Sequence, residues 1–114
     1  MDEKVFFGKG IRRIKEEDPE LYESIVDLDK SVWDGEVLDY RTQKLIAIAI
    51  SATNHESSSF LKQVSKAKKE LDISRDEMMD VLKVVLLTSG MIPFKKALKI
   101  INKLYDWFFI WMIL

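Results

Sequence analysis

The order of apolar and polar residues along the chain predicts an all-α fold. Apolar side chains recur every three or four positions over most of the chain, which is the spacing of residues on one face of a helix. No stretch with the alternating pattern of a strand competes with this periodicity. We therefore expect a compact helical domain of about five helices.

Capping residues mark the start of the first predicted helix. Asp18, Pro19 and Glu20 stand in the order of an N-cap, a proline in the first turn and an acidic residue near the positive end of the helix dipole. The helix is expected to end at the Trp-Asp-Gly sequence of residues 33–35. Its apolar face is expected to contain Leu21, Ile25, Leu28 and Val32.

The second predicted helix is the most apolar one. Asp39 can cap its start, and the helix runs from about Tyr40 to Thr53. Residues 45–50, Leu-Ile-Ala-Ile-Ala-Ile, are apolar on every side, so we expect this helix to be the most deeply buried.

Three more helices follow a polar cluster at residues 54–59. Serines of that cluster can cap the third helix, and Ser74 with Glu77 forms the S-x-x-E capping box of the fourth. Gly90 is expected to end the fourth helix, and Pro93 to begin the fifth. The expected apolar face of the third helix contains Phe60, Val64, Ala67 and Leu71.

Composition narrows the possible functions. The chain of 114 residues is 47% apolar and 32% charged with a net charge of −1, so we expect one globular domain over residues 1–114 and no nucleic-acid partner. It contains no cysteine and one histidine, which excludes thiolate catalysis and histidine-rich metal sites, and we expect neither metal nor cofactor. The charged N-terminus does not resemble a signal peptide, so we expect a cytoplasmic protein.

The C-terminal tail, residues 105–114, ends in eight uncharged residues, Trp107 to Leu114. This stretch is too short for a membrane span, which takes about 20 residues. We expect the fifth helix to continue through it and to be buried between subunits. Contact with a membrane surface is the alternative.

His55 and Glu56 are the candidate catalytic residues. Histidine and glutamate are common general acids and bases, and both stand in the polar cluster that follows the most apolar helix. Position 59 is serine, so the second histidine of an H-E-x-x-H zinc site is missing. A capping or hydrogen-bonding role for His55 is the structural alternative.

Four stretches occur in a characteristic order: DPEL at residues 18–21, GEVLD at 35–39, RTQKLIAIAIS at 41–51 and the capped helix pair at 73–98. In this order the chain resembles the carboxymuconolactone decarboxylase family, which includes alkylhydroperoxidase D-like proteins, over roughly residues 17–104. The resemblance implies an all-α domain that assembles as a homo-oligomer, a trimer or a hexamer.

The resemblance also implies where the chemistry of redox-active members is lost. Their two cysteines fall on Glu56 and Ser59, their histidine on Gln63 and their relay glutamate on Lys44. All four residues differ, so the resemblance implies a link to oxygen or peroxide defence without the thiol mechanism. We expect Lys44 and Glu56 to form an ion pair in the former site, with Gln63 adding a hydrogen bond.

Three functions stay open. The first is a family protein associated with oxygen or peroxide defence that has no redox cysteines. The second is a decarboxylase-like enzyme that uses His55 and Glu56 on a small-molecule ligand. The third is a non-catalytic oligomeric assembly protein.

Overall fold

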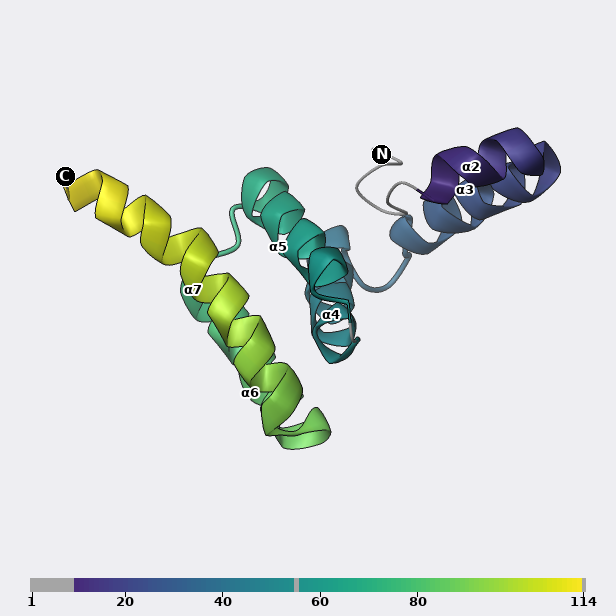
Figure 1. Ribbon diagram of the computed structural model, residues 1–114. Helices are drawn as coiled ribbons and strands as arrows, with labels where there is room; N and C mark the ends of the chain where they lie inside the picture. Colours follow the sequence, from purple (N-terminus) through teal and green to yellow (C-terminus); the bar gives the residue numbers. More distant parts are fainter. Residues whose placement is uncertain (1–9, 55, 114) are drawn as a thin grey trace. The chain divides into compact units, whose positions relative to one another are not determined.

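The chain folds entirely into helices in the part that the structure describes. The computed structural model describes residues 10–54 and 56–113, with side chains up to residue 106 (Figure 1). The all-α prediction is therefore confirmed. The six helices of the described part are α2 (Gly10–Glu17), α3 (Pro19–Trp33), α4 (Tyr40–Thr53), α5 (Ser57–Leu71), α6 (Arg75–Ser89) and α7 (Met91–Ile113).

The chain divides into two compact units, residues 1–43 and 44–114. In the first unit, α2 and α3 pack against each other, and Ile11 and Tyr22 are buried. Asp18 links the two helices and caps α3 as predicted, because its side chain accepts a hydrogen bond from the Leu21 amide at 3.1 Å. Sequence analysis did not predict α2, a helix of eight residues that is mostly charged.

The buried face of α3 differs from the predicted one. Leu21 and Leu28 are exposed, whereas Tyr22 and Asp29 are buried. The indole nitrogen of Trp33 donates a hydrogen bond to Asp29 at 2.8 Å, which allows a carboxylate to stand on the buried face. The buried face is thus offset by one residue from the face that hydrophobic periodicity selects.

The connection between α3 and α4 is held by polar contacts. Asp39 caps α4 as predicted and accepts a hydrogen bond from the Thr42 amide at 2.7 Å. The Gln43 side chain reaches back and donates to the Val32 carbonyl at 2.7 Å. It crosses Gly35 so closely that a Cβ atom there would lie 2.5 Å from the Gln43 amide nitrogen. Glycine is therefore required at position 35.

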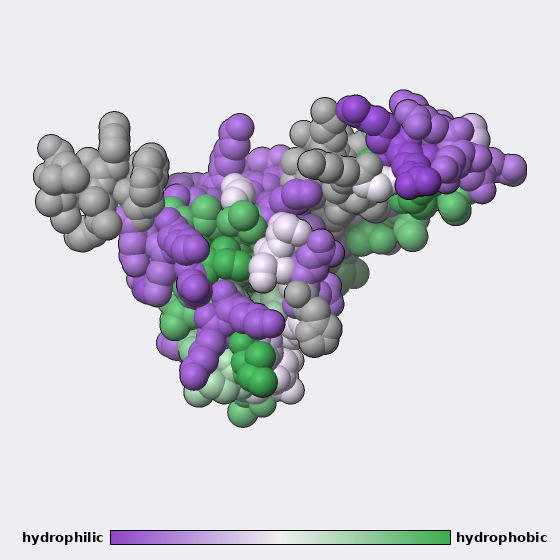
Figure 2. Space-filling model, viewed as in Figure 1, coloured by the Kyte–Doolittle hydropathy of each residue, from purple (hydrophilic) through white to green (hydrophobic). Residues whose placement is uncertain are grey.

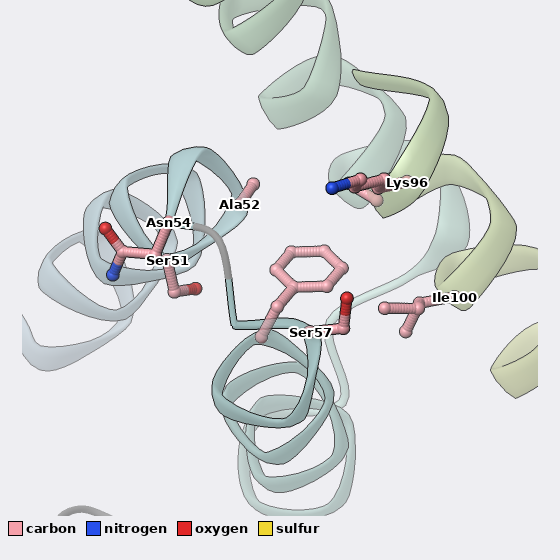
Figure 3. Close-up of a pocket in the computed structure, with 8 residues that line it drawn as sticks. Ser51, Ala52, Asn54, Ser57, Lys96 and Ile100 are labelled. Atoms are coloured by element: carbon pink, nitrogen blue, oxygen red, sulfur yellow. The ribbon is translucent and has the colours of Figure 1, made fainter. Parts of the chain in front are cut away.

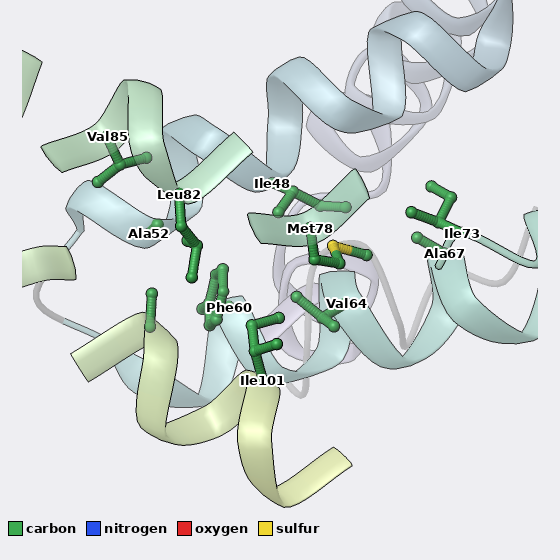
Figure 4. Close-up of a cluster of buried hydrophobic side chains, with 11 residues drawn as sticks. Ile48, Ala52, Phe60, Val64, Ala67, Ile73, Met78, Leu82, Val85 and Ile101 are labelled. Carbon is green, nitrogen blue, oxygen red and sulfur yellow. The ribbon is translucent and has the colours of Figure 1, made fainter. Parts of the chain in front are cut away.

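The second unit contains one hydrophobic core built from α4 to α7, and α6 and α7 pack side by side (Figure 1). The core side chains converge from all four helices and from the α5–α6 connection (Figure 4). They are Ile48, Ala52, Phe60, Val64, Ala67, Ile73, Met78, Leu82, Val85, Ala97 and Ile101.

Helix α4, which was expected to be the most deeply buried helix, buries one face and leaves apolar residues of the opposite face exposed. Ile48 and Lys44 are fully buried, but Ile46 is 45% exposed and Ile50 is 59% exposed. A helix packed on one side of a small core leaves its opposite side uncovered, whatever residues stand there.

The ends of α6 agree with the sequence prediction. Ser74 accepts a hydrogen bond from the Glu77 amide at 3.1 Å, and the Glu77 carboxylate accepts one from the Ser74 amide at 3.3 Å. Gly90 ends the helix with a φ angle of 94°, a conformation that favours glycine. Helix α7 begins at Met91, so Pro93 lies within its first turn, where the missing amide hydrogen costs little.

Helix α7 continues to Ile113, so the predicted continuation of the last helix into the tail is correct. The side chains of residues 107–114 lie outside the described part. Among the described residues, no helix has both the length and the apolarity needed to cross a lipid bilayer.

Candidate functional site

The candidate site is the junction between α4 and α5, where sequence analysis placed the catalytic residues. Its histidine, His55, lies outside the described residues. Glu56 is the N-cap of α5 and is exposed, and its carboxylate accepts a hydrogen bond from the Ser58 hydroxyl at 3.1 Å. The three serines expected to cap α5 instead form its first turn.

The four positions on which the family resemblance places the thiol relay have different environments. Lys44 on α4 is fully buried, and Gln63 on α5 is 8% exposed. Ser59 is half-buried, whereas Glu56 is exposed. Lys44 and Gln63 flank core residues, since Lys44 lies one turn before Ile48 and Gln63 directly precedes Val64. The relay positions thus divide into a buried pair and a pair near the surface.

The position of Lys44 along α4 disfavours the predicted ion pair. Lys44 stands nine residues before the last residue of α4, which corresponds to about 14 Å along the helix axis. Glu56 stands just beyond that end of the helix. This axial separation is longer than a lysine side chain, so the ammonium and the carboxylate are not expected to meet directly.

Gln63 places a polar group beside the core. Its carbonyl oxygen, Oε1, is buried and has no hydrogen-bond partner. A buried acceptor without a partner costs about 1–3 kcal/mol, and such groups are rare in folded proteins. The buried side of α5 is therefore not purely apolar.

A shallow hollow lies at the same junction, between the end of α4, the start of α5 and helix α7 (Figure 3). Its cavity volume is about 10 Å³, which is room for about one water molecule, so a larger molecule would lie at its open side. Lys96 points from α7 toward the end of α4, and the Ser57 hydroxyl points toward α7. The lining residues are Ser51, Ala52, Asn54, Ser57, Phe60, Lys96, Ala97 and Ile100.

The electrostatics of this hollow favour a small anion. Ser57 is the first residue of α5, so the hollow lies at the positive end of that helix dipole. Lys96 adds a positive charge from α7, and the Glu56 carboxylate at the N-cap of α5 adds an opposing negative charge that is exposed to solvent. Phe60 supplies an apolar surface beside these polar groups. The arrangement suits a small molecule that carries a carboxylate.

None of the predicted site residues that the structure describes lines this hollow. Glu56 and Lys44 do not line it, although Ser57 directly follows Glu56. Lys96 was not predicted, because Lys95 and Lys96 look alike in the sequence and only the packing of α7 places one of them at the hollow. In the described part of the chain, no group of three or more histidine, aspartate or glutamate residues could hold a metal ion.

Comparison with known proteins decides the family. Residues 19–103 match the model of the carboxymuconolactone decarboxylase family. The chain belongs to this family. The match begins at the capped start of α3 and runs into α7, so it includes the whole α4–α5 junction of this carboxymuconolactone decarboxylase family member.

Two relatives come from Methanocaldococcus jannaschii. The chain is 52% identical to uncharacterized protein MJ0742 over 104 residues, which cover 91% of this chain and the full length of the relative. It is 35% identical to uncharacterized protein MJ1511 over 94 residues, which cover 82% of this chain and 87% of the relative. The carboxymuconolactone decarboxylase family is thus represented by relatives of nearly the same length.

Proposed function

We propose that this family member binds a small carboxylated molecule at the α4–α5 junction and acts on it without thiol chemistry. The observation that carries the proposal is the hollow in which Lys96 and the N-terminus of α5 face the same space. A cation and a helix N-terminus both stabilise a carboxylate. The absence of cysteine excludes a thiolate nucleophile.

Each residue has a role in this proposal. Lys96 is the counter-ion of the ligand carboxylate, and Ser57 donates a hydrogen bond to it. His55 and Glu56 stand in the sequence between two residues of the lining, Asn54 and Ser57, and serve as the acid–base pair that moves a proton on the bound ligand. The reaction class is then proton transfer coupled to decarboxylation or isomerisation.

A role in oxygen or peroxide defence is proposed only as an indirect one, through the family membership. Without a cysteine, the chain has no thiol with which to take electrons from a dithiol and pass them to a peroxide. We therefore expect no peroxide turnover above the background rate when peroxide and a dithiol donor are supplied. Robust turnover by the purified protein would contradict this.

Binding of small carboxylates tests the proposal. Acetate, succinate and benzoate are titrated into the protein while backbone amide shifts are followed by NMR, with choline as a cationic control. We expect shifts at residues 51–60 with the acids only, and at least tenfold weaker binding in Lys96→Met than in the control Lys95→Met. Equal binding by both variants, or no shifts with any acid, would contradict the proposal and favour the non-catalytic alternative.

Assembly is the remaining part of the proposal. Residues 1–114 form one domain of this family, which is supported by a family match that runs across the boundary between the two units. The domain assembles into a trimer or a hexamer, which is supported by apolar side chains that the single chain leaves exposed. Four of these exposed apolar side chains lie where α6 ends and α7 begins (Figure 2): Val84, Leu87, Met91 and Ile92.

A further inference from the structure

The last polar contacts that the structure describes between α7 and the rest of the second unit are concentrated at residues 102–106. Helix α7 has 23 residues, and its final part extends beyond the ends of α5 and α6 with a change of direction (Figure 1). The contacts stand just before this extension, residues 107–113. They join Lys68 to Leu104, Ile73 to Tyr105, and Arg75 to Asn102 and Asp106.

Lys68 makes the most unusual of these contacts. Its ammonium group donates a hydrogen bond to the Leu104 carbonyl at 2.9 Å and stands 4.6 Å from the centre of the Tyr105 ring. A carbonyl within a helix normally accepts only from the amide four residues later. The Leu104 carbonyl has a second lone pair that can accept from this charged donor, and a side chain bonded to a helix carbonyl in this way is one known cause of a bend in a helix.

Tyr105 and Arg75 hold the same part of α7 from the side of α6. The Tyr105 hydroxyl donates to the Ile73 carbonyl at 2.7 Å. Burial, with smaller contributions from the negative charges of Glu77 and Asp72, raises the pKa of Tyr105 to about 12, so the hydroxyl remains a donor at neutral pH. The Arg75 guanidinium donates to the Asn102 side-chain carbonyl at 2.7 Å.

From this arrangement we propose that Lys68, Tyr105 and Arg75 form a bracket that sets the direction in which residues 107–113 leave the domain. The bracket acts as a conformational device, because it presents the uncharged end of α7 as a fixed arm. The direction of the arm then depends on one charge, that of the Lys68 ammonium group. Loss of the Lys68 ammonium releases the Leu104 carbonyl and the Tyr105 ring together, while the core contacts of α6 and α7 remain.

Hydrogen exchange of backbone amides tests this bracket. The variants are Lys68→Met, Lys68→Arg, Tyr105→Phe and the control Lys69→Met, which changes the exposed neighbour on α5. In Lys68→Met we expect exchange at residues 106–113 to be about tenfold faster, since a charge-assisted hydrogen bond is lost and only a local opening is affected. Amides of residues 78–101 should change less than about twofold, and Lys68→Arg should restore slow exchange.

Two results would overturn the proposal. One is unchanged exchange at residues 106–113 in Lys68→Met, which would show that the bracket does not hold the arm. The other is an equal acceleration over the whole second unit, which would assign Lys68 a general role in stability. If Lys68→Met does not fold, Tyr105→Phe decides, because it removes one hydroxyl and should accelerate exchange at the same amides by a smaller factor.

Discussion

At the scale of single residues, capping side chains fix where α3, α4 and α6 begin, and Lys44 is buried in the second unit. Asp18, Asp39 and Ser74 cap their helices as predicted, because an N-cap bonds to an amide only two or three residues away. The burial of Lys44 depends instead on how distant helices pack, and nothing in its sequence neighbourhood indicates it. The role of Lys96 at the hollow is hidden for the same reason.

Substitutions at Lys44 test what this buried residue contributes. Lys44→Ala removes a buried side chain and leaves a cavity, so we expect it to lower the free energy of unfolding by about 2–4 kcal/mol. Lys44→Met keeps most of the volume and should cost less than Lys44→Ala. Chemical denaturation followed by circular dichroism measures both changes.

A double-mutant cycle that combines Lys44→Met with Glu56→Gln tests whether Lys44 and Glu56 form an ion pair. Because the positions of the two residues disfavour a direct contact, the coupling energy between Lys44→Met and Glu56→Gln should be below about 0.5 kcal/mol. A coupling above about 1 kcal/mol would show that the two charges do interact, contrary to the separation along α4.

At the scale of elements, the bounds of the helices were more predictable than their buried faces. The second predicted helix, about Tyr40 to Thr53, has the bounds of α4, because a cap and a polar cluster mark its ends. The buried face of α3 differs from the predicted one, since hydrophobic periodicity cannot tell a face covered by the same chain from one left exposed. Helix α2 has too few apolar residues to give a periodic signal.

The cap of α4 gives a prediction about acid. The hydrogen bonds from Thr42 hold the pKa of Asp39 below its ordinary value of 3.8. A lowered pKa in the folded state contributes stability above pH 3.8, which is lost as the pH falls through the folded-state value. Asp39→Asn keeps a capping side chain without a charge to titrate.

Stability against urea, measured from pH 6 to pH 2.5, checks this. The parent should lose stability more steeply than Asp39→Asn below about pH 4. The control is Asp27→Asn, at an exposed position within α3, and its stability should fall with pH as steeply as that of the parent. Curves of the parent and Asp39→Asn that stay parallel down to pH 2.5 would contradict a titrating cap.

At the scale of the whole molecule, the family could be predicted from sequence and the chemistry of the site could not. The order of capped helices is enough to indicate the carboxymuconolactone decarboxylase family, which the match over residues 19–103 confirms. The chemistry depends on which side chains meet at the α4–α5 junction. The residues that line the hollow there come from segments more than 30 residues apart in the sequence, as Ser57 and Lys96 do.

The exposed apolar residues predict self-association. Leu87 is 87% exposed and Ile92 is 73% exposed, and burial of such side chains between subunits is favourable. Light scattering on a sizing column should give a mass of about 40 kDa or a multiple of it, three times the 13.3 kDa of one chain. Leu87→Glu should shift the protein toward smaller species if this surface is buried in the oligomer, and Thr88→Glu is the control for charge alone.

A monomer of 13.3 kDa at micromolar concentration would contradict this expectation. A stable dimer would retain self-association but reject the trimer or hexamer that the family resemblance implies.

The link of one residue between α6 and α7, Gly90, also bears on the order in which the chain folds. Closing such a short loop costs little chain entropy, so these two helices can find each other before the distant parts of the core assemble. Leu82→Ala, within α6, should therefore slow refolding in stopped-flow experiments, whereas Ala52→Gly, at the end of α4, should mainly accelerate unfolding. The time course of folding would then begin at Gly90, six residues before Lys96 of the proposed site.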